Sequence, residues 1–221
     1  MHAMTRWAVG GVVLASGMIL AGCSAPEVPG PAPTPSVVWS AGEPSGPLES
    51  DPWVQAVRAG ALPQAVALNS RDLRSPSLHA ALTSTAVRDV YGILHEYARD
   101  NSTDDDGARR APGPRPFDPL SVDVAPDGKS ATVKGCTVFD WLITQDDGVF
   151  DDGAEPVQGW YDVVLSSSGA YRVDHFTITG GACESQNLTI GTFDPLPDGN
   201  WDYWQEDILK GGFAEDPSEV P

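Results

Sequence analysis

Two of the three cysteines lie deep in the chain, and their spacing suits a single covalent bridge. Cys136 and Cys183 are the only cysteines after position 23. In an oxidising compartment such a pair forms a disulfide by default, and it would close a loop of about 48 residues. Zinc is the competing ligand, but neither cysteine belongs to a CxxC pair and no histidine stands near either at ligand spacing. The pattern favours a disulfide.

Runs of aspartate and glycine could bind a metal ion. They occupy residues 104–107, 146–148 and 151–153. Oxygen ligands gathered in a turn are what Ca²⁺ requires, although the spacing differs from that of an EF-hand loop. Solvated turns have the same composition. We interpret the runs as such turns, with a weak calcium site at residues 146–152 as the alternative, and assign no metal site.

The common catalytic motifs do not fit this chain. His95 and Glu96 begin like the helix of a zinc protease, but Arg99 stands where the second histidine is needed. The sequence also contains no GxSxG nucleophile elbow, no SxxK pair and no glycine-rich phosphate loop. The motifs therefore indicate no enzyme class and imply no cofactor.

The composition excludes some classes of partner. The 221 residues contain 13 Lys and Arg against 31 Asp and Glu, which gives a formal charge of −18. Such a chain repels phosphate backbones and anionic lipid headgroups, so binding to nucleic acid is disfavoured. Seven tryptophans and 41% hydrophobic residues are enough for the core of one domain. No run long enough to span a membrane follows residue 25.

The N-terminus has the pattern of an export signal. Arg6 precedes an uncharged apolar stretch, Trp7 to Ala21, which ends in Leu20-Ala21-Gly22-Cys23. This tetrapeptide resembles the lipobox of bacterial lipoproteins. The resemblance implies cleavage after residue 22 and a diacylglycerol thioether on Cys23, with palmitate among the attached chains. Two or more acyl chains anchor a protein stably to a membrane. We therefore expect a lipid-anchored protein on the extracytoplasmic face of the cell membrane.

The rest of the chain divides by composition. Residues 23–50 carry seven prolines and predict a disordered tether after the signal peptide of residues 1–22. A folded domain is predicted for residues 51–184, followed by an acidic extension at 185–221. Within the domain, apolar periodicity predicts helices at 52–68, 76–83 and 85–99, with Pro63 kinking or dividing the first. Alternation and turn residues predict strands at 120–124, 130–141, 160–167 and 171–179.

Helices followed by hairpins indicate an α+β fold with N-terminal helices packed on a curved antiparallel sheet. The stretches DPWVQAVRAGALPQAVALNSRDL, HEYARD, DGKSATVKGC and GAYRVDHFTITGGAC resemble actinobacterial lipoproteins and secreted proteins with a nuclear-transport-factor-2-like domain. The resemblance covers residues 51–184. It implies a cystatin-like cone with a pocket on the concave side of the sheet. Both enzymes and binding modules use this fold, so the fold alone does not decide the function.

The same resemblance supplies weak catalytic candidates, since its enzymes place Asp, His or Tyr in the cone. Here these are Tyr91, Asp162, Asp174 and His175. Adjacent residues of a strand point to opposite faces, so Asp174 and His175 cannot form a dyad. Asp162 and His175 could meet across neighbouring strands. We interpret these residues as a solvated strand-face aspartate and a partly buried histidine.

The C-terminal extension contains Trp201, Tyr203 and Trp204, which could either form a contact surface for a protein or glycan or cover the open end of the sheet.

Together these patterns predict a non-catalytic binding or accessory module of the cell envelope, whose partner is an envelope protein or an apolar small molecule. The alternative is a surface enzyme of the isomerase, dehydratase or cyclase type, using an Asp or His in the cone pocket.

Overall fold

The computed structural model describes residues 35–70, 72–100, 110–139, 141, 155–185 and 187–195. In these ranges the chain forms three helices and six strands. The helices are α1 (Pro52–Ser70), α2 (Pro76–Ala81) and α3 (Ser84–Asp100). The strands are β1 (Ser36–Trp39), β2 (Phe117–Val124), β3 (Ser130–Thr137), β4 (Val157–Leu165), β5 (Tyr171–Ala182) and β6 (Gly191–Asp194).

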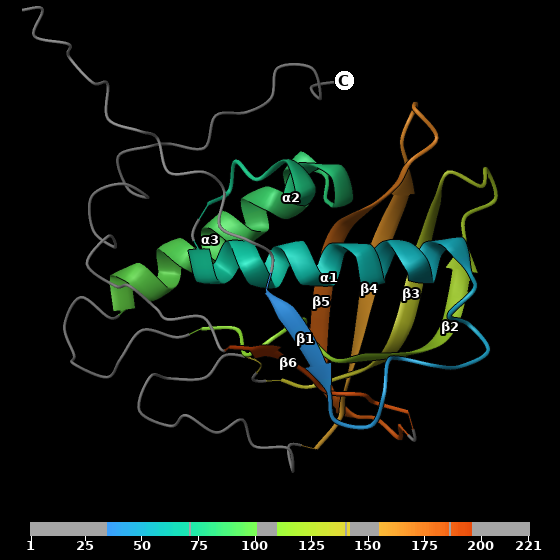
Figure 1. Cartoon of the computed structure of the whole chain (residues 1–221). Helices are drawn as coiled ribbons and strands as arrows, with labels where there is room; N and C mark the ends of the chain where they lie inside the picture. The colour runs from blue at the N-terminus through green and yellow to red at the C-terminus, as the bar shows by residue number, and fades with distance from the viewer. Residues whose placement is uncertain are drawn as a thin grey trace, which may run out of the picture. The chain divides into compact units, whose positions relative to one another are not determined.

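The main sheet is antiparallel and has the order β2-β3-β4-β5. It is curved, and α1 lies across its strands (Figure 1). The core fills the space between the helices and one face of the sheet, with Val57 and Val87 from the helices and Val133 and Val163 from the strands all buried. The predicted α+β class, with N-terminal helices on a curved antiparallel sheet, is confirmed.

Helix α1 begins and ends close to the predicted limits. Asp51 caps it, because its Oδ1 accepts a hydrogen bond of 2.8 Å from the backbone N–H of Trp53. Pro52 occupies the first helical position, where its missing N–H costs nothing. The helix is not divided at Pro63, contrary to one of the two expectations, and runs on to Ser70. Its small buried residues, such as Gly60, let it lie close to Val173 of β5.

Strand β4 alternates as predicted, with Tyr161 and Val163 buried on the face toward the helices. Strand β5 does not alternate, because a bulge interrupts its pairing with β4. Asp162 pairs with His175 and Val163 pairs with Val173, which leaves Asp174 as the extra residue. The bulge allows both Val173 and Phe176 to pack on the core.

Strands β1 and β6 form a second, two-stranded antiparallel sheet in which Val37 pairs with Phe193. From the sequence we expect both segments to lie outside the domain, in the tether of residues 23–50 and the extension of residues 185–221. That expectation is wrong for residues 36–39 and 191–194. The reason is burial of apolar side chains, because Phe193 is 4% exposed and packs in a second core cluster with Ala65 of α1 and Trp141.

The segment that precedes β2 completes this second cluster. Asn69 of α1 makes two hydrogen bonds of 2.8 Å to the backbone of Ala111. The backbone N–H of Phe193 donates to the carbonyl oxygen of Pro112 at 2.7 Å. A Cβ at Gly113 would lie 2.1 Å from the carbonyl oxygen of Gly191, so only glycine permits this close approach. Residues 111–113 are thus held between α1 and β6.

The predicted disulfide between Cys136 and Cys183 is present, with the two Cα atoms 5.6 Å apart. It joins β3 to the segment that leads from β5 to β6. Ser185 strengthens the same attachment, because its hydroxyl donates to Oδ2 of the buried Asp118 at 2.7 Å. Within the described ranges, no helix has both the length and the apolar character needed to cross a lipid bilayer.

Breaking the disulfide with a Cys136→Ser, Cys183→Ser double variant should lower the free energy of unfolding by about 2–4 kcal/mol, because the unfolded chain regains the freedom of the closed loop. Urea unfolding of the variant and of the parent protein measures the difference. A reducing agent should destabilise the parent and leave the variant unchanged. Equal stability of the two proteins would show that the bridge constrains nothing.

Gly191→Ala should separate β1 from β6, because its Cβ would lie 2.6 Å from Cζ3 of Trp39 and 2.7 Å from Cγ1 of Val37. We expect the free energy of unfolding to fall by about 1–3 kcal/mol, as for other overpacked sites. Gly46→Ala is the matched control, since nothing lies within 4 Å of its added Cβ. The packing account of the β1–β6 sheet is contradicted if the two variants are equally stable.

Candidate functional site

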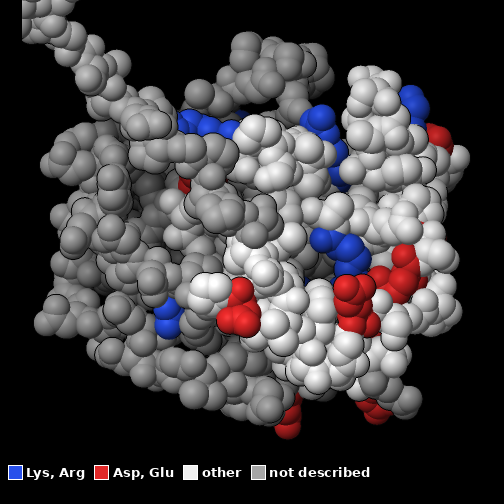
Figure 2. All heavy atoms as spheres, in the orientation of Figure 1, with Lys and Arg blue, Asp and Glu red and all other residues white. Residues whose placement is uncertain are grey.

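A cavity of about 520 Å³ lies between α1, β1 and the segment just before β2. Its volume is in the range of small-molecule sites. Much of its wall is apolar and includes Val37, Trp39, Ala61, Leu62 and Pro114. Its charged residues are Glu43, Glu49, Arg58 and Arg115. Basic and acidic side chains lie directly beside one another in the middle of the face that Figure 2 shows.

Arg58 is fixed by a two-point ion pair with Glu49. Its Nε donates to Oε2 at 3.0 Å and its Nη2 donates to Oε1 at 2.5 Å. Both side chains are about four-fifths buried, at 23% and 19% exposed, and a partly buried two-point pair is more rigid than a surface one. Arg58, Ala61 and Leu62 share one face of α1 by their i, i+3, i+4 spacing, and all three line the cavity.

Arg115 reaches the same cavity from the other side. Its Nη1 donates to the carbonyl oxygen of Val138 at 2.8 Å. Its guanidinium carbon lies 5.2 Å from the centre of the Phe176 ring, a cation–π distance. Phe176 in turn stacks on Tyr161, with ring centres 4.4 Å apart and an angle of 28° between the planes. The Phe176 ring therefore links Arg115 to Tyr161.

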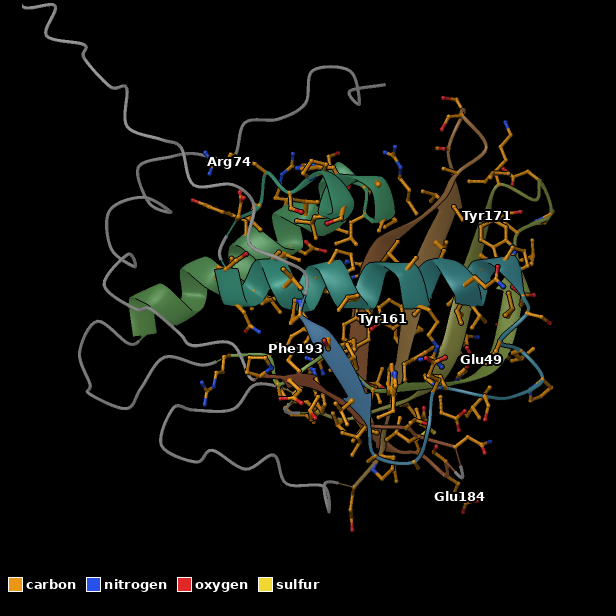
Figure 3. All side chains as sticks on the ribbon, viewed as in Figure 1. Glu49, Arg74, Tyr161, Tyr171, Glu184 and Phe193 are labelled. Carbon is orange, nitrogen blue, oxygen red and sulfur yellow. A yellow bond between two sulfur atoms is a disulfide. The ribbon has the colours of Figure 1, made fainter. Side chains whose placement is uncertain are left out.

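Tyr161 lies in the core next to Phe176 and is not among the residues that line the cavity. It is 1% exposed, and Phe117 contacts it edge-on with ring centres 4.9 Å apart. Its hydroxyl is buried and has no hydrogen-bond partner in the part of the chain that the structure describes. Figure 3 labels this side chain beneath α1. Burial raises the pKa of the phenol to about 12, although the charges of Arg115 and Arg58 oppose that rise. The hydroxyl is therefore a protonated donor at physiological pH.

The candidate catalytic aspartates are both engaged in structural hydrogen bonds. Asp162 accepts from the hydroxyl of Thr132 on the neighbouring strand at 2.7 Å. Asp174, the bulge residue, accepts from the hydroxyl of Thr83 at 2.7 Å, just before α3 begins. Neither aspartate lines the cavity described above. Their contacts connect neighbouring elements of the fold.

His175 and Tyr91 also lie away from that cavity. Asp162 and His175 are paired across β4 and β5, as the sequence allowed. The imidazole Nδ1 of His175, however, contacts Oδ2 of Asp89 on α3 at 2.7 Å, with both side chains about half exposed. Tyr91 is partly buried on α3. The four catalytic candidates therefore do not share a pocket among the pockets of the described residues.

The other candidates lie outside the described residues. These are Cys23, the aromatic residues Trp201, Tyr203 and Trp204, and the acidic runs at 104–107, 146–148 and 151–153. Among the residues that are described, no three His, Cys, Asp or Glu side chains are grouped closely enough to hold a metal ion.

Comparison with protein-family models, with curated proteins and with solved structures finds no match to this chain. The function is therefore inferred from the residues of the cavity themselves.

Sequence reasoning missed the residues that form this cavity. Trp39 lay in a segment assigned to the tether, and Arg58 and Arg115 belong to no motif. Two signals were present. Val37-Val38-Trp39 is a β-prone apolar run within a proline-rich segment. Arg58 is a cation on the same helix face as apolar residues.

Tyr161→Phe should preserve or raise the stability at neutral pH, because it removes a buried hydroxyl that lacks a partner. The wild-type free energy of unfolding should also fall by up to about 3 kcal/mol between about pH 10 and about pH 12. Over that range the unfolded phenol has lost its proton while the folded phenol retains it. The variant should lose less stability over the same range. Urea unfolding across this pH range tests both points, and parallel curves for the two proteins would contradict the assignment.

Proposed function

We propose that this protein is a lipid-anchored binding module of a bacterial cell envelope that holds a small molecule in the cavity between α1 and β1. We also propose that the domain is a cone-shaped relative of the nuclear-transport-factor-2-like proteins, extended by the β1–β6 sheet. The observation that carries the functional proposal is the cavity itself, which combines a largely apolar wall with two arginines and two glutamates.

Binding without turnover fits the chemistry of the described residues better than catalysis does. A general base needs a free carboxylate or imidazole within reach of the bound molecule. The cavity contains two carboxylates, and Glu49 is already paired with Arg58. Glu43 is exposed. The other candidate bases, Asp162, Asp174 and His175, have structural partners outside the cavity.

The expected location is supported by the disulfide, because such bridges persist in oxidising compartments. The anchor on Cys23 would place the domain near the membrane surface. Ser36 is the thirteenth residue after Cys23, so the chain between them can extend about 45 Å at most. This is roughly half of the reach that a tether ending at residue 50 would allow.

Cys23→Ala should move the protein from the membrane fraction to the soluble fraction, because the proposed thioether is its attachment. Incorporation of radiolabelled palmitate into the parent protein, and its loss in the variant, gives a second measurement. The folded domain should be unchanged, which a thermal melt verifies. A Cys23→Ala protein that still sediments with the membrane would refute the proposed anchor.

Native mass spectrometry of the protein extracted from its own membrane tests the binding function. We expect an added mass that is lost in Leu62→Trp, because the larger side chain fills the cavity. Val124→Trp is the control, since Val124 is 50% exposed on β2 and is not part of the cavity wall. An unliganded parent protein, or a bound mass that both variants retain, would count against a ligand in this cavity.

A further inference from the structure

The residues that line the cavity indicate the class of molecule that it accepts. We infer that the cavity binds an uncharged, mainly apolar molecule and that Trp39 of β1 is the side chain that determines this specificity. This inference rests on the proposed binding function and adds the chemistry of the ligand and the residue that selects it.

The charged side chains of the cavity do not favour a ligand of either sign. They are two arginines and two glutamates, so their formal charges cancel, in a chain whose formal charge is −18. Arg58 and Glu49 already neutralise each other through two hydrogen bonds, with both side chains about four-fifths buried. A charged ligand would lose its hydration on entering the cavity and would gain no net opposite charge in return.

The other two charged residues do not change this balance. Nη1 of Arg115 donates to the carbonyl oxygen of Val138 at 2.8 Å, its guanidinium lies over the ring of Phe176, and it has a further interaction. Glu43 is exposed, where water and salt weaken its field. Neither residue therefore offers an uncompensated buried charge to a ligand.

Trp39 presents the largest apolar side chain of the cavity wall, and it is held in place. It pairs with Gly191 across the β1–β6 sheet, and its ring atoms Cζ3 and Cε3 would lie only 2.6 and 2.7 Å from a Cβ added there. The ring thus occupies the space that the missing side chain leaves free. The backbone N–H of the next residue, Ser40, donates to the carbonyl oxygen of Ile190 at 2.9 Å. A side chain that is already ordered loses little freedom when a ligand binds.

Val37 lies on the same face of β1 as Trp39, because alternate residues of a strand point to the same side. Both line the cavity and are partly buried, whereas Val38 between them is 53% exposed and is not part of the wall. The cavity thus receives the apolar face of β1. Removing this surface from water stabilises a complex in proportion to the apolar area buried.

The rest of the wall adds apolar surface and few polar groups. Ala61 and Leu62 contribute aliphatic side chains from α1. Pro35, Pro44 and Pro114 also line the cavity, and a proline has no backbone N–H to donate. Few hydrogen-bond donors are therefore available to orient a strongly polar ligand.

The test compares three soluble eight-carbon probes that differ only in head group: octanol, octanoate and octylammonium. Isothermal titration calorimetry uses the full chain with Cys23→Ala, which removes the proposed lipid. We expect octanol to bind at least tenfold more tightly than either charged probe, because neither charge finds a net opposite charge in the cavity. A charged probe of either sign that binds as tightly as octanol would overturn the inferred ligand class.

Trp39→Leu should weaken octanol binding by about fivefold or more, because it removes much of the apolar surface of the wall. Trp160→Leu is the matched control, since Trp160 is another partly buried strand tryptophan and does not line the cavity. It should leave octanol binding unchanged, and equal effects of the two substitutions would overturn the role of Trp39. A thermal melt checks that β1 keeps its place in Trp39→Leu.

If Trp39→Leu melts at a lower temperature, Leu62→Trp provides the test, because it fills the cavity from α1 and leaves Trp39 in place. It should weaken octanol binding at least tenfold, and an unchanged affinity would overturn the inference. Failure of all three probes to bind the parent chain would also overturn it. The bound mass in native mass spectrometry, and its loss in Leu62→Trp, decides separately on the proposed binding function.

Discussion

The pairing of β1 with β6 is the contact on which the cavity depends. It joins residues 36–39, which precede the helices in the sequence, to residues 191–194, which follow the last strand of the main sheet. Without that pairing, Val37 and Trp39 would not stand opposite Arg58 and Leu62 of α1. The three segments lie very close together. Gly191 contacts Trp39 of β1 and also Gly113, and neither glycine has room for a side chain. The disulfide and the bond from Ser185 to Asp118 hold the chain that leads into β6.

Local sequence patterns predicted the helices and most of the strands, whereas pairings between segments far apart in the sequence were not predicted. The helices followed from their 3.6-residue periodicity, the Asp51-Pro52 start and the Ser75-Pro76 start, and the disulfide followed from the count of cysteines. Strand β1 was missed because its partner lies more than 150 residues away and no local signal specifies such a pairing. The bulge at Asp174 explains why the two faces of β5 could not be distinguished by alternation.

At the candidate site, too, the contact between neighbouring strands was predictable, whereas the contacts between distant segments were not. Asp162 and His175 were expected to be able to meet, and they do pair across β4 and β5. Their hydrogen bonds, however, lead to Thr132 and Asp89 instead of to each other. The cavity was not predicted, since it is assembled from three separate segments, residues 35–49, 58–62 and 114–115. Tyr161 lowers the stability of the fold, because its buried hydroxyl has no hydrogen-bond partner among the described residues, a cost that a phenylalanine would avoid.

Hydrogen–deuterium exchange tests the central claim most directly, because it locates bound material whatever the chemical identity of that material. The protein taken from its own membrane is compared with the same protein after removal of bound small molecules. A ligand in the cavity predicts slower exchange in β1 and in α1 around Arg58 when the molecule is present, since bound material stabilises the elements that enclose it. Slower exchange confined to β2–β5, or no difference between the two preparations, would contradict a ligand site between α1 and β1.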